Sequence, residues 1–138
     1  VQAKPACSMA PFAVTPDELG DRWANGRVNL NLEVRWNDER FGNASGSEMS
    51  VGFHELVAHA AARRSLCAGT IVGSGTVSND NYREVGSSCI SERRSIEMVD
   101  SGEPVTPFMS FGDSIYMEAR NTDDSVLFGA IDQRVVQA

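Results

Sequence analysis

The chain has 138 residues, about the length of one ordinary domain, and its 41% apolar and 22% charged residues are a globular balance. Its formal net charge of −7 argues against nucleic-acid binding, which requires clustered Lys and Arg, because the longest basic runs are only pairs. No stretch approaches the ~20 apolar residues of a membrane-spanning helix.

The three cysteines, Cys7, Cys67 and Cys89, are odd in number and widely spaced. A disulfide framework requires an even and denser set, and a zinc site built from sulfur is typically announced by closely spaced pairs. We therefore expect three free thiols and a cytoplasmic protein.

The first predicted element is a short helix that begins near Thr15. Thr15 is a suitable N-cap, Pro16 suits the first helical position, and Glu18 has the spacing of a capping box. Asn25-Gly26 predicts the end of this helix. Residues 28–36 then alternate between apolar and polar, which predicts a half-buried strand.

The middle of the chain mixes strand and helix patterns. Residues 37–39 predict a turn into a return strand that starts at Arg40, and the small polar residues 43–47 predict a loop. Residues 53–64 place apolar side chains at helical spacing and end in two arginines, which suits a helix C-terminus. Residues 70–77 predict a buried strand interrupted by glycines, and glycine inside a strand often marks the close approach of a ligand or another backbone.

The last third of the chain predicts a polar loop over residues 78–86 and a hairpin near the end. The strands of this hairpin are expected at 114–120 and 126–131, with a polar turn between them. Taken together, these patterns predict an α+β, sheet-dominated fold.

Two stretches approach known functional motifs but lack the spacing or the residues that those motifs require. His54 and His59 are five residues apart, so on a regular helix their imidazoles point about 140° away from each other and do not share a metal ion. Residues 73–78 approach the dinucleotide fingerprint, but a serine replaces its last glycine and no helical pattern follows. We interpret the histidines as surface or core-edge residues.

Several runs of sequence, in the same order, resemble the C-terminal part of the fumarylacetoacetate hydrolase family. The most specific are Gly-Thr-Ile-Val-Gly-Ser-Gly-Thr-Val-Ser-Asn and Val-Gly-Ser-Ser-Cys-Ile-Ser-Glu-Arg-Arg. A lysine segment, a Glu-Leu-Val-Ala helix, a Phe-Gly-Asp strand and a closing Phe-Gly-Ala-Ile-Asp-Gln strand accompany them. The runs occupy residues 2–11, 53–64, 69–79, 85–94, 111–118 and 128–133.

This resemblance implies that residues 1–138 are the C-terminal part of one catalytic domain with a mixed β-roll or sandwich, incomplete on its N-terminal side. It implies a metal-dependent hydrolase that cleaves a carbon–carbon bond in a 1,3-diketo acid of the fumarylacetoacetate or acylpyruvate type, in the breakdown of aromatic compounds. Related decarboxylases and dehydratases share the same chemistry.

The resemblance also implies a cofactor and partners. Family members bind Mg²⁺, or Mn²⁺ or Ca²⁺, through a Glu-x-Glu pair and an aspartate that lie upstream of the lysine segment, so we expect no metal ligand in this chain. The expected partners are a small keto-acid substrate and a second copy of the full-length protein, with no nucleic acid and no membrane.

Five residues match functional positions of the family. Lys4 would stabilise developing negative charge on the keto acid, and Glu92 would help a histidine from the upstream part of the family domain to activate water. Ser8, Gly75 and Thr76 would contact substrate: two through hydroxyl groups, and the glycine by permitting close approach.

Two other hypotheses remain at this stage. The chain is a non-catalytic truncated homologue or interaction module that lacks the metal site, or it is a binding protein of unrelated fold whose matches are due to chance. A catalytic function requires Lys4 and Thr76 to converge on one pocket. We expect the chain by itself to be inactive and, if strands are missing, to self-associate through unpaired edges and exposed apolar faces.

Overall fold

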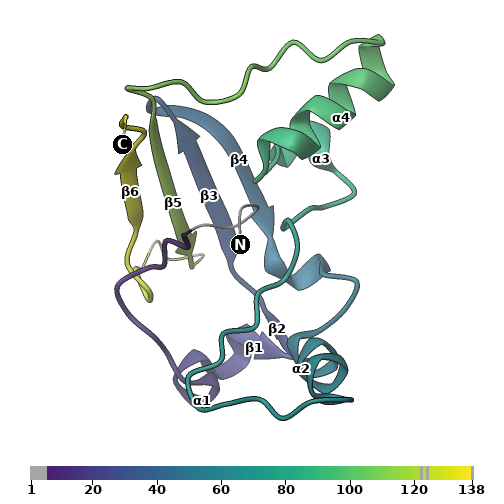
Figure 1. Ribbon diagram of the computed structural model, residues 1–138, viewed down its shortest axis with the longest axis vertical. Helices are drawn as coiled ribbons and strands as arrows, with labels where there is room; N and C mark the ends of the chain where they lie inside the picture. Colours follow the sequence, from purple (N-terminus) through teal and green to yellow (C-terminus); the bar gives the residue numbers. More distant parts are fainter. Residues whose placement is uncertain (1–5, 122, 124, 138) are drawn as a thin grey trace.

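The computed structural model describes residues 6–121, 123 and 125–137, and it has two antiparallel sheets with helices beside them (Figure 1). One sheet has two strands, β1 and β2, and the other has four strands in the order β4-β3-β5-β6 and is not closed. The predicted α+β, sheet-dominated class is confirmed. The elements are α1 (Pro16–Leu19), β1 (Trp23–Ala24), β2 (Arg27–Val28), β3 (Asn31–Trp36), β4 (Glu39–Ser45), α2 (Phe53–Ala61), α3 (Tyr82–Val85), α4 (Ile90–Ser101), β5 (Ser114–Arg120) and β6 (Ile131–Arg134).

The β3–β4 hairpin follows from local sequence. Asn37 and Asp38 both have positive φ, at 52° and 65°. A two-residue type I′ turn requires this conformation at both positions, and its twist matches that of the two strands it joins. The alternation in β3 places Val34 in the core, at 2% exposure, and Glu33 on the opposite face. The predicted loop at 43–47 is wrong in its first half, because β4 continues to Ser45.

Strand β5 matches its predicted bounds and pairs with the whole of β3, from Asn31 opposite Arg120 to Trp36 opposite Ile115. The return strand forms later than predicted, since β6 begins at Ile131 rather than near Val126. Among the described residues between the two strands, Val126 forms an isolated bridge with Arg120. The connection from β5 to β6 is therefore longer than predicted.

The first helix is shorter than its sequence signals suggest. Helix α1 ends at Leu19, and the Thr15 side chain makes no capping hydrogen bond. Gly20, with φ 55°, interrupts the helix before a short 3-10 turn. The buried Leu19 holds this turn against the rest of the chain.

Helix α2 forms where predicted, although it ends at Ala61. The Glu55 carboxylate accepts the Gly52 N–H at 2.9 Å and so closes its first turn. The rings of Phe53 and Trp23 stack with centroids 6.4 Å apart, which ties α2 to the small sheet. In Figure 1 these elements lie together below the four-stranded sheet.

Two features of the middle segment differ from expectation. The predicted buried strand at 70–77 is wrong, because these residues belong to neither sheet of the described residues and Ile71 is 69% exposed. The strand-like composition of this run does not by itself produce a strand, which needs backbone hydrogen bonds to a neighbouring strand. Helix α4 was not predicted, and it ends at Gly102 in the left-handed conformation that glycine tolerates.

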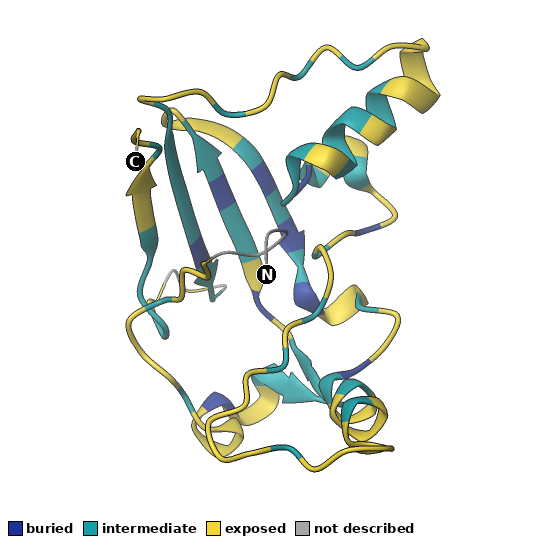
Figure 2. Cartoon of the chain, viewed as in Figure 1, coloured by how far each residue is buried: buried dark blue, intermediate teal, exposed yellow. Residues whose placement is uncertain are grey.

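Burial is concentrated on β3, β4 and the segments that touch them (Figure 2). Among the described residues the buried apolar side chains are few: Leu19, Leu30, Val34 and Ala44. Large apolar side chains on α4 and the segment after it are exposed, including Val99 and Phe111. None of the helices in the described part of the chain has the length and apolar character needed to cross a membrane.

Candidate active site

Glu92 is the third residue of α4, and both of its carboxylate oxygens have hydroxyl partners. The Ser78 hydroxyl donates to Oε1 and the Ser87 hydroxyl donates to Oε2. Ser78 comes from the segment before α3, and Ser87 from the turn between α3 and α4. The first turn of a helix also favours a negative charge, because its backbone N–H groups point outward.

The edge of β4 fixes the position of Ser87. The Ser87 N–H donates to the Phe41 carbonyl at 3.2 Å, and the side chain is fully buried. A Cβ atom on Gly42 would lie 2.1 Å from the Ser87 carbonyl oxygen, so only glycine permits this approach. Gly86 has φ 76° and equally close neighbours on β4. Two glycines, 44 residues apart in sequence, therefore place Ser87 against the sheet.

The same edge holds Ser78 through its neighbour Asn79. The Asn79 side-chain oxygen accepts the Ser45 N–H at 2.7 Å, and its nitrogen donates to the Ser45 carbonyl at 2.9 Å. A side-chain amide thus makes the two bonds that a neighbouring strand residue would make. Asn79 is buried, so these bonds anchor the segment that carries Ser78.

Thr76 reaches the same cluster through Cys89, the N-cap of α4. Burial alone would raise the pKa of the Cys89 thiol. The backbone N–H groups of Glu92 and Ser91 and the Thr76 hydroxyl outweigh burial, and the pKa lies below its ordinary value. Thr76 therefore lies near the N-terminus of α4.

Gly75 and Thr76 also face a hollow of about 310 Å³ on the side toward α2. A Cβ atom on Gly75 would meet nothing within 4 Å, so protein packing does not require glycine there. The predicted close approach by a ligand is untested, but the space beside Gly75 is open. The hollow is lined by Met49, Ser50, Val51, Leu56, Ser74, Gly75 and Thr76.

Ser8 lies elsewhere. Its hydroxyl donates to Gln133 Oε1 at 2.9 Å, and the Phe12 N–H donates to the Phe128 carbonyl at 3.1 Å. The N-terminal segment therefore runs beside β6, whereas Glu92 lies beside β4, at the opposite edge of the sheet. Three strand spacings separate these edges, roughly 14 Å. Lys4 lies outside the described residues.

The structure thus places Thr76 near the start of α4, which carries Glu92, and Gly75 beside Thr76 in the hollow, and it leaves Ser8 at the opposite edge of the sheet. Sequence reasoning missed Ser78, Ser87 and Cys89. The signal in the sequence was a run of small polar residues just before a helix that itself went unpredicted.

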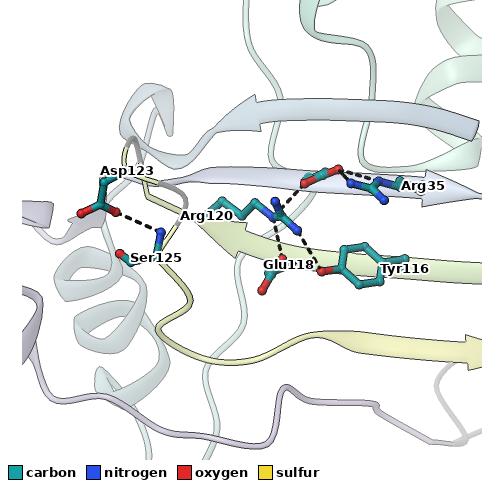
Figure 3. A network of polar contacts seen from close by, with 7 residues as sticks. Arg35, Tyr116, Glu118, Arg120, Asp123 and Ser125 are labelled. Atoms are coloured by element: carbon teal, nitrogen blue, oxygen red, sulfur yellow. Dashed lines mark hydrogen bonds and ion pairs between the residues drawn. The ribbon is translucent and has the colours of Figure 1, made fainter. Parts of the chain in front are cut away.

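A second polar cluster lies on the β3–β5 face (Figure 3). Arg120 Nε donates to Glu118 at 2.6 Å and lies 2.9 Å from Glu33, while Arg35 also contacts Glu33, at 2.5 Å. The Tyr116 hydroxyl donates to Glu118, which is 4% exposed. Two guanidinium groups balance two carboxylates, so the cluster joins two strands and is neutral overall.

Burial would raise the pKa of Glu118, but the hydrogen bonds from Tyr116 and Arg120 and the charge of Arg120 lower it below its usual range. The hydroxyl of Tyr116 and the carboxylate of Glu118 raise the pKa of Arg120. Glu118 and Arg120 therefore carry opposite charges at neutral pH.

Within residues 6–121, 123 and 125–137, no three His, Cys, Asp or Glu side chains are grouped so as to hold a metal ion. His54 and His59 are both exposed on α2. The described residues therefore do not fit a metal centre.

No curated protein matches the chain. A family model described as "Fumarylacetoacetate (FAA) hydrolase C-terminal" matches residues 2–136, which is nearly the whole sequence. The match covers both the β4-edge cluster around Glu92 and the sheet that supports it. The chain belongs to the fumarylacetoacetate hydrolase family.

Proposed function

We propose that the chain is part of a metal-dependent hydrolase that cleaves a carbon–carbon bond in a 1,3-diketo acid of the fumarylacetoacetate or acylpyruvate type. The family match supports the hydrolase class. The observation that carries the proposal is the placement of Glu92: a carboxylate at the start of α4, held by two hydroxyls and adjacent to the Thr76–Cys89 contact.

The reaction needs a base and a group that stabilises an oxyanion. The oxygen of a water molecule bonds to the distal keto carbon as a base accepts the water proton, and the carbonyl π pair moves onto oxygen to give an oxyanion. The C=O bond then re-forms while the bond from that carbon to the methylene breaks. The electron pair of the broken bond becomes the enolate of the released keto acid, which is protonated on carbon. The products are one carboxylic acid and one keto acid.

In this proposal Glu92 is the carboxylate that takes part in activating water, and the Thr76 hydroxyl donates to a substrate oxygen. Gly75 leaves room for the substrate beside Thr76. Lys4 and Ser8 belong to the keto-acid side of the site, where an ammonium group stabilises the developing negative charge. Because Ser8 lies at the β6 edge, this assignment places the substrate across the sheet or requires the N-terminal segment to shift.

Members of this family are generally metal-dependent. No group of three His, Cys, Asp or Glu side chains among the described residues fits a metal ion. We propose that the ion, Mg²⁺ or alternatively Mn²⁺ or Ca²⁺, is bound by another part of the full-length protein. A homodimer, a cytoplasmic location and a role in aromatic catabolism complete the proposal.

A non-catalytic role as a truncated homologue or interaction module is the second candidate. Two observations favour it: Ser8 is separated from Thr76 and Glu92 by the width of the sheet, and the described residues lack a metal-binding group.

The test compares the full-length wild-type protein with Glu92→Gln, each supplied with Mg²⁺ or Mn²⁺ and an acylpyruvate. Loss of the enol absorbance and release of pyruvate report hydrolysis. We expect the wild type to form both products in equal amounts and Glu92→Gln to lower kcat by at least ~10²-fold. Unchanged kcat in Glu92→Gln would overturn the role of Glu92. Failure of the wild type on a series of acylpyruvates would favour the non-catalytic role.

A further inference from the structure

We propose that Ser78 and Ser87 are positioning residues that hold the Glu92 carboxylate in a single orientation for catalysis. This inference rests on the proposed function, in which Glu92 takes part in activating water. It assigns a role to two serines from separate segments, because each donates to a different oxygen of the same carboxylate.

A glutamate side chain on a helix rotates about three bonds, and binding one oxygen leaves the other free to swing. Binding both oxygens fixes the plane of the carboxylate and its direction. A carboxylate has about four acceptor positions, so two hydroxyl donors leave the remaining positions available to water. The contacts with Ser78 and Ser87 therefore orient Glu92 without using up its capacity as a base.

Ser87 is the more rigid of the two donors. It is fully buried, and the close approach of Gly42 holds its backbone on β4. Its hydroxyl oxygen accepts the Cys89 N–H at 3.2 Å and lies 3.0 Å from the Cys89 carbonyl oxygen. The single hydroxyl proton goes to the charged Glu92 carboxylate, since bonds to ionised acceptors are the stronger ones.

Ser78 is more exposed, but its segment is anchored on both sides. Asn79 binds both backbone groups of Ser45, and the Ser88 hydroxyl donates to the Val77 carbonyl at 2.8 Å. The segment that carries Ser78 is therefore held in place by contacts other than the one with Glu92. A group that positions Glu92 needs such independent support, whereas a group that only ties a loop to the helix does not.

The competing explanation is structural: the serines and Glu92 would only attach two loops to α4. A structural tether affects folding stability and leaves the turnover of folded protein unchanged. A positioning role lowers kcat in folded protein while substrate affinity changes little, because the carboxylate is misoriented only in the reacting complex.

The experiment uses the full-length protein with its divalent ion and an acylpyruvate, and it compares Ser87→Ala, Ser78→Ala, Ser78→Thr and Ser95→Ala. Ser95→Ala is the matched control, because it removes an exposed serine hydroxyl of the same helix that donates to the Ser91 carbonyl. We expect Ser87→Ala to lower kcat by ~10-fold and Ser78→Ala by ~3-fold, with KM within about twofold. Ser78→Thr, which keeps the hydroxyl, should restore most of the kcat, and Ser95→Ala should leave it unchanged.

Melting curves by circular dichroism identify the folded variants, and if Ser87→Ala does not fold, the Ser78 pair carries the test. Wild-type kcat in folded Ser78→Ala and Ser87→Ala, or an equal loss in Ser95→Ala, overturns the positioning role. The Glu92→Gln variant shows whether the positioning role alone is wrong or whether the proposed function of Glu92 is wrong as well. If Glu92→Gln is inactive while the serine variants are fully active, only the positioning role is wrong. If Glu92→Gln is fully active, both are wrong.

Discussion

Glu92 is partly buried and Glu118 is buried, and each accepts a hydrogen bond from a hydroxyl group. The surroundings of the two carboxylates differ. Glu118 lies on a strand with the guanidinium of Arg120 2.6 Å away, and burial leaves it 4% exposed. Glu92 lies at a helix start, and no salt bridge to it is found among the described residues. Glu118 is paired with a cation and helps to join two strands, whereas Glu92 is held by two hydroxyl groups from separate segments.

The largest change in folding stability expected from this comparison follows from substitution of Glu118. Glu118→Gln leaves Arg120 without one of its two carboxylate partners and should lower the free energy of unfolding by about 2 kcal/mol. The kcat of the folded fraction should stay near that of the wild type, the opposite of Glu92→Gln. Urea denaturation and kinetics on the same preparations measure both. A kcat loss in Glu118→Gln without loss of stability would reverse the two assignments.

The second prediction concerns the support of the Glu92 cluster. Gly42→Ala introduces a Cβ atom 2.1 Å from the Ser87 carbonyl oxygen, and backbone must move to accommodate it. We expect a loss of about 1–3 kcal/mol in unfolding free energy, together with a lower kcat as Ser87 shifts away from Glu92. Thermal melts and kinetics provide the readouts.

Gly75→Ala is the control for Gly42→Ala, since its Cβ atom would meet nothing within 4 Å. Its stability should remain within about 0.5 kcal/mol of the wild type. Equal destabilisation by the two substitutions would show that the β4 edge has no special role.

The third prediction is a pH dependence from Glu118. Its pKa is lowered in the folded protein, so its contribution is fully present above the unfolded pKa of about 4.3. That contribution is lost as the pH falls through the lower, folded pKa. Melting temperatures measured from pH 7 down to pH 3 should fall more steeply in the wild type than in Glu118→Gln. Parallel curves would contradict this origin of the acid sensitivity.

The smallest expected effect is the response to metal. Because the described residues lack a metal-binding group, titration of Mg²⁺ or Mn²⁺ into the 138-residue chain should give no heat of specific binding. The same titration of the full-length protein should give a saturable signal, and chelation should remove it. Tight binding of one ion by the 138-residue chain would place the metal site within this sequence.

The sequence predicted the parts of the fold that local patterns determine. Strands β3 and β5 have clear alternation, and the Asn37-Asp38 turn is set by residues that tolerate positive φ. The run at 70–77 has the composition of a strand but no partner edge. Helix α4 has few apolar positions, and it depends on distant contacts such as that of Arg93 with the Phe41 carbonyl at 2.8 Å.

The candidate site could be predicted only where resemblance to the family supplied residue positions. Thr76 and Glu92 were proposed as site residues in this way, and periodicity alone did not indicate either of them. Ser78 and Ser87 were not identified, because their placement depends on contacts between segments more than 30 residues apart, such as Asn79 with Ser45. No local pattern encodes such a contact.

The pairing of β3 with β5 has a further consequence. The first two strands of the four-stranded sheet lie before the exposed, ladder-free segment 66–77, and the last two lie after it. Cleavage of the backbone in that segment would leave two pieces, each with one hairpin, joined along the full length of the central pair. The domain is therefore organised as two complementary halves that a single nick would convert into a heterodimer, with Glu92 in one half and the β4 edge that supports it in the other.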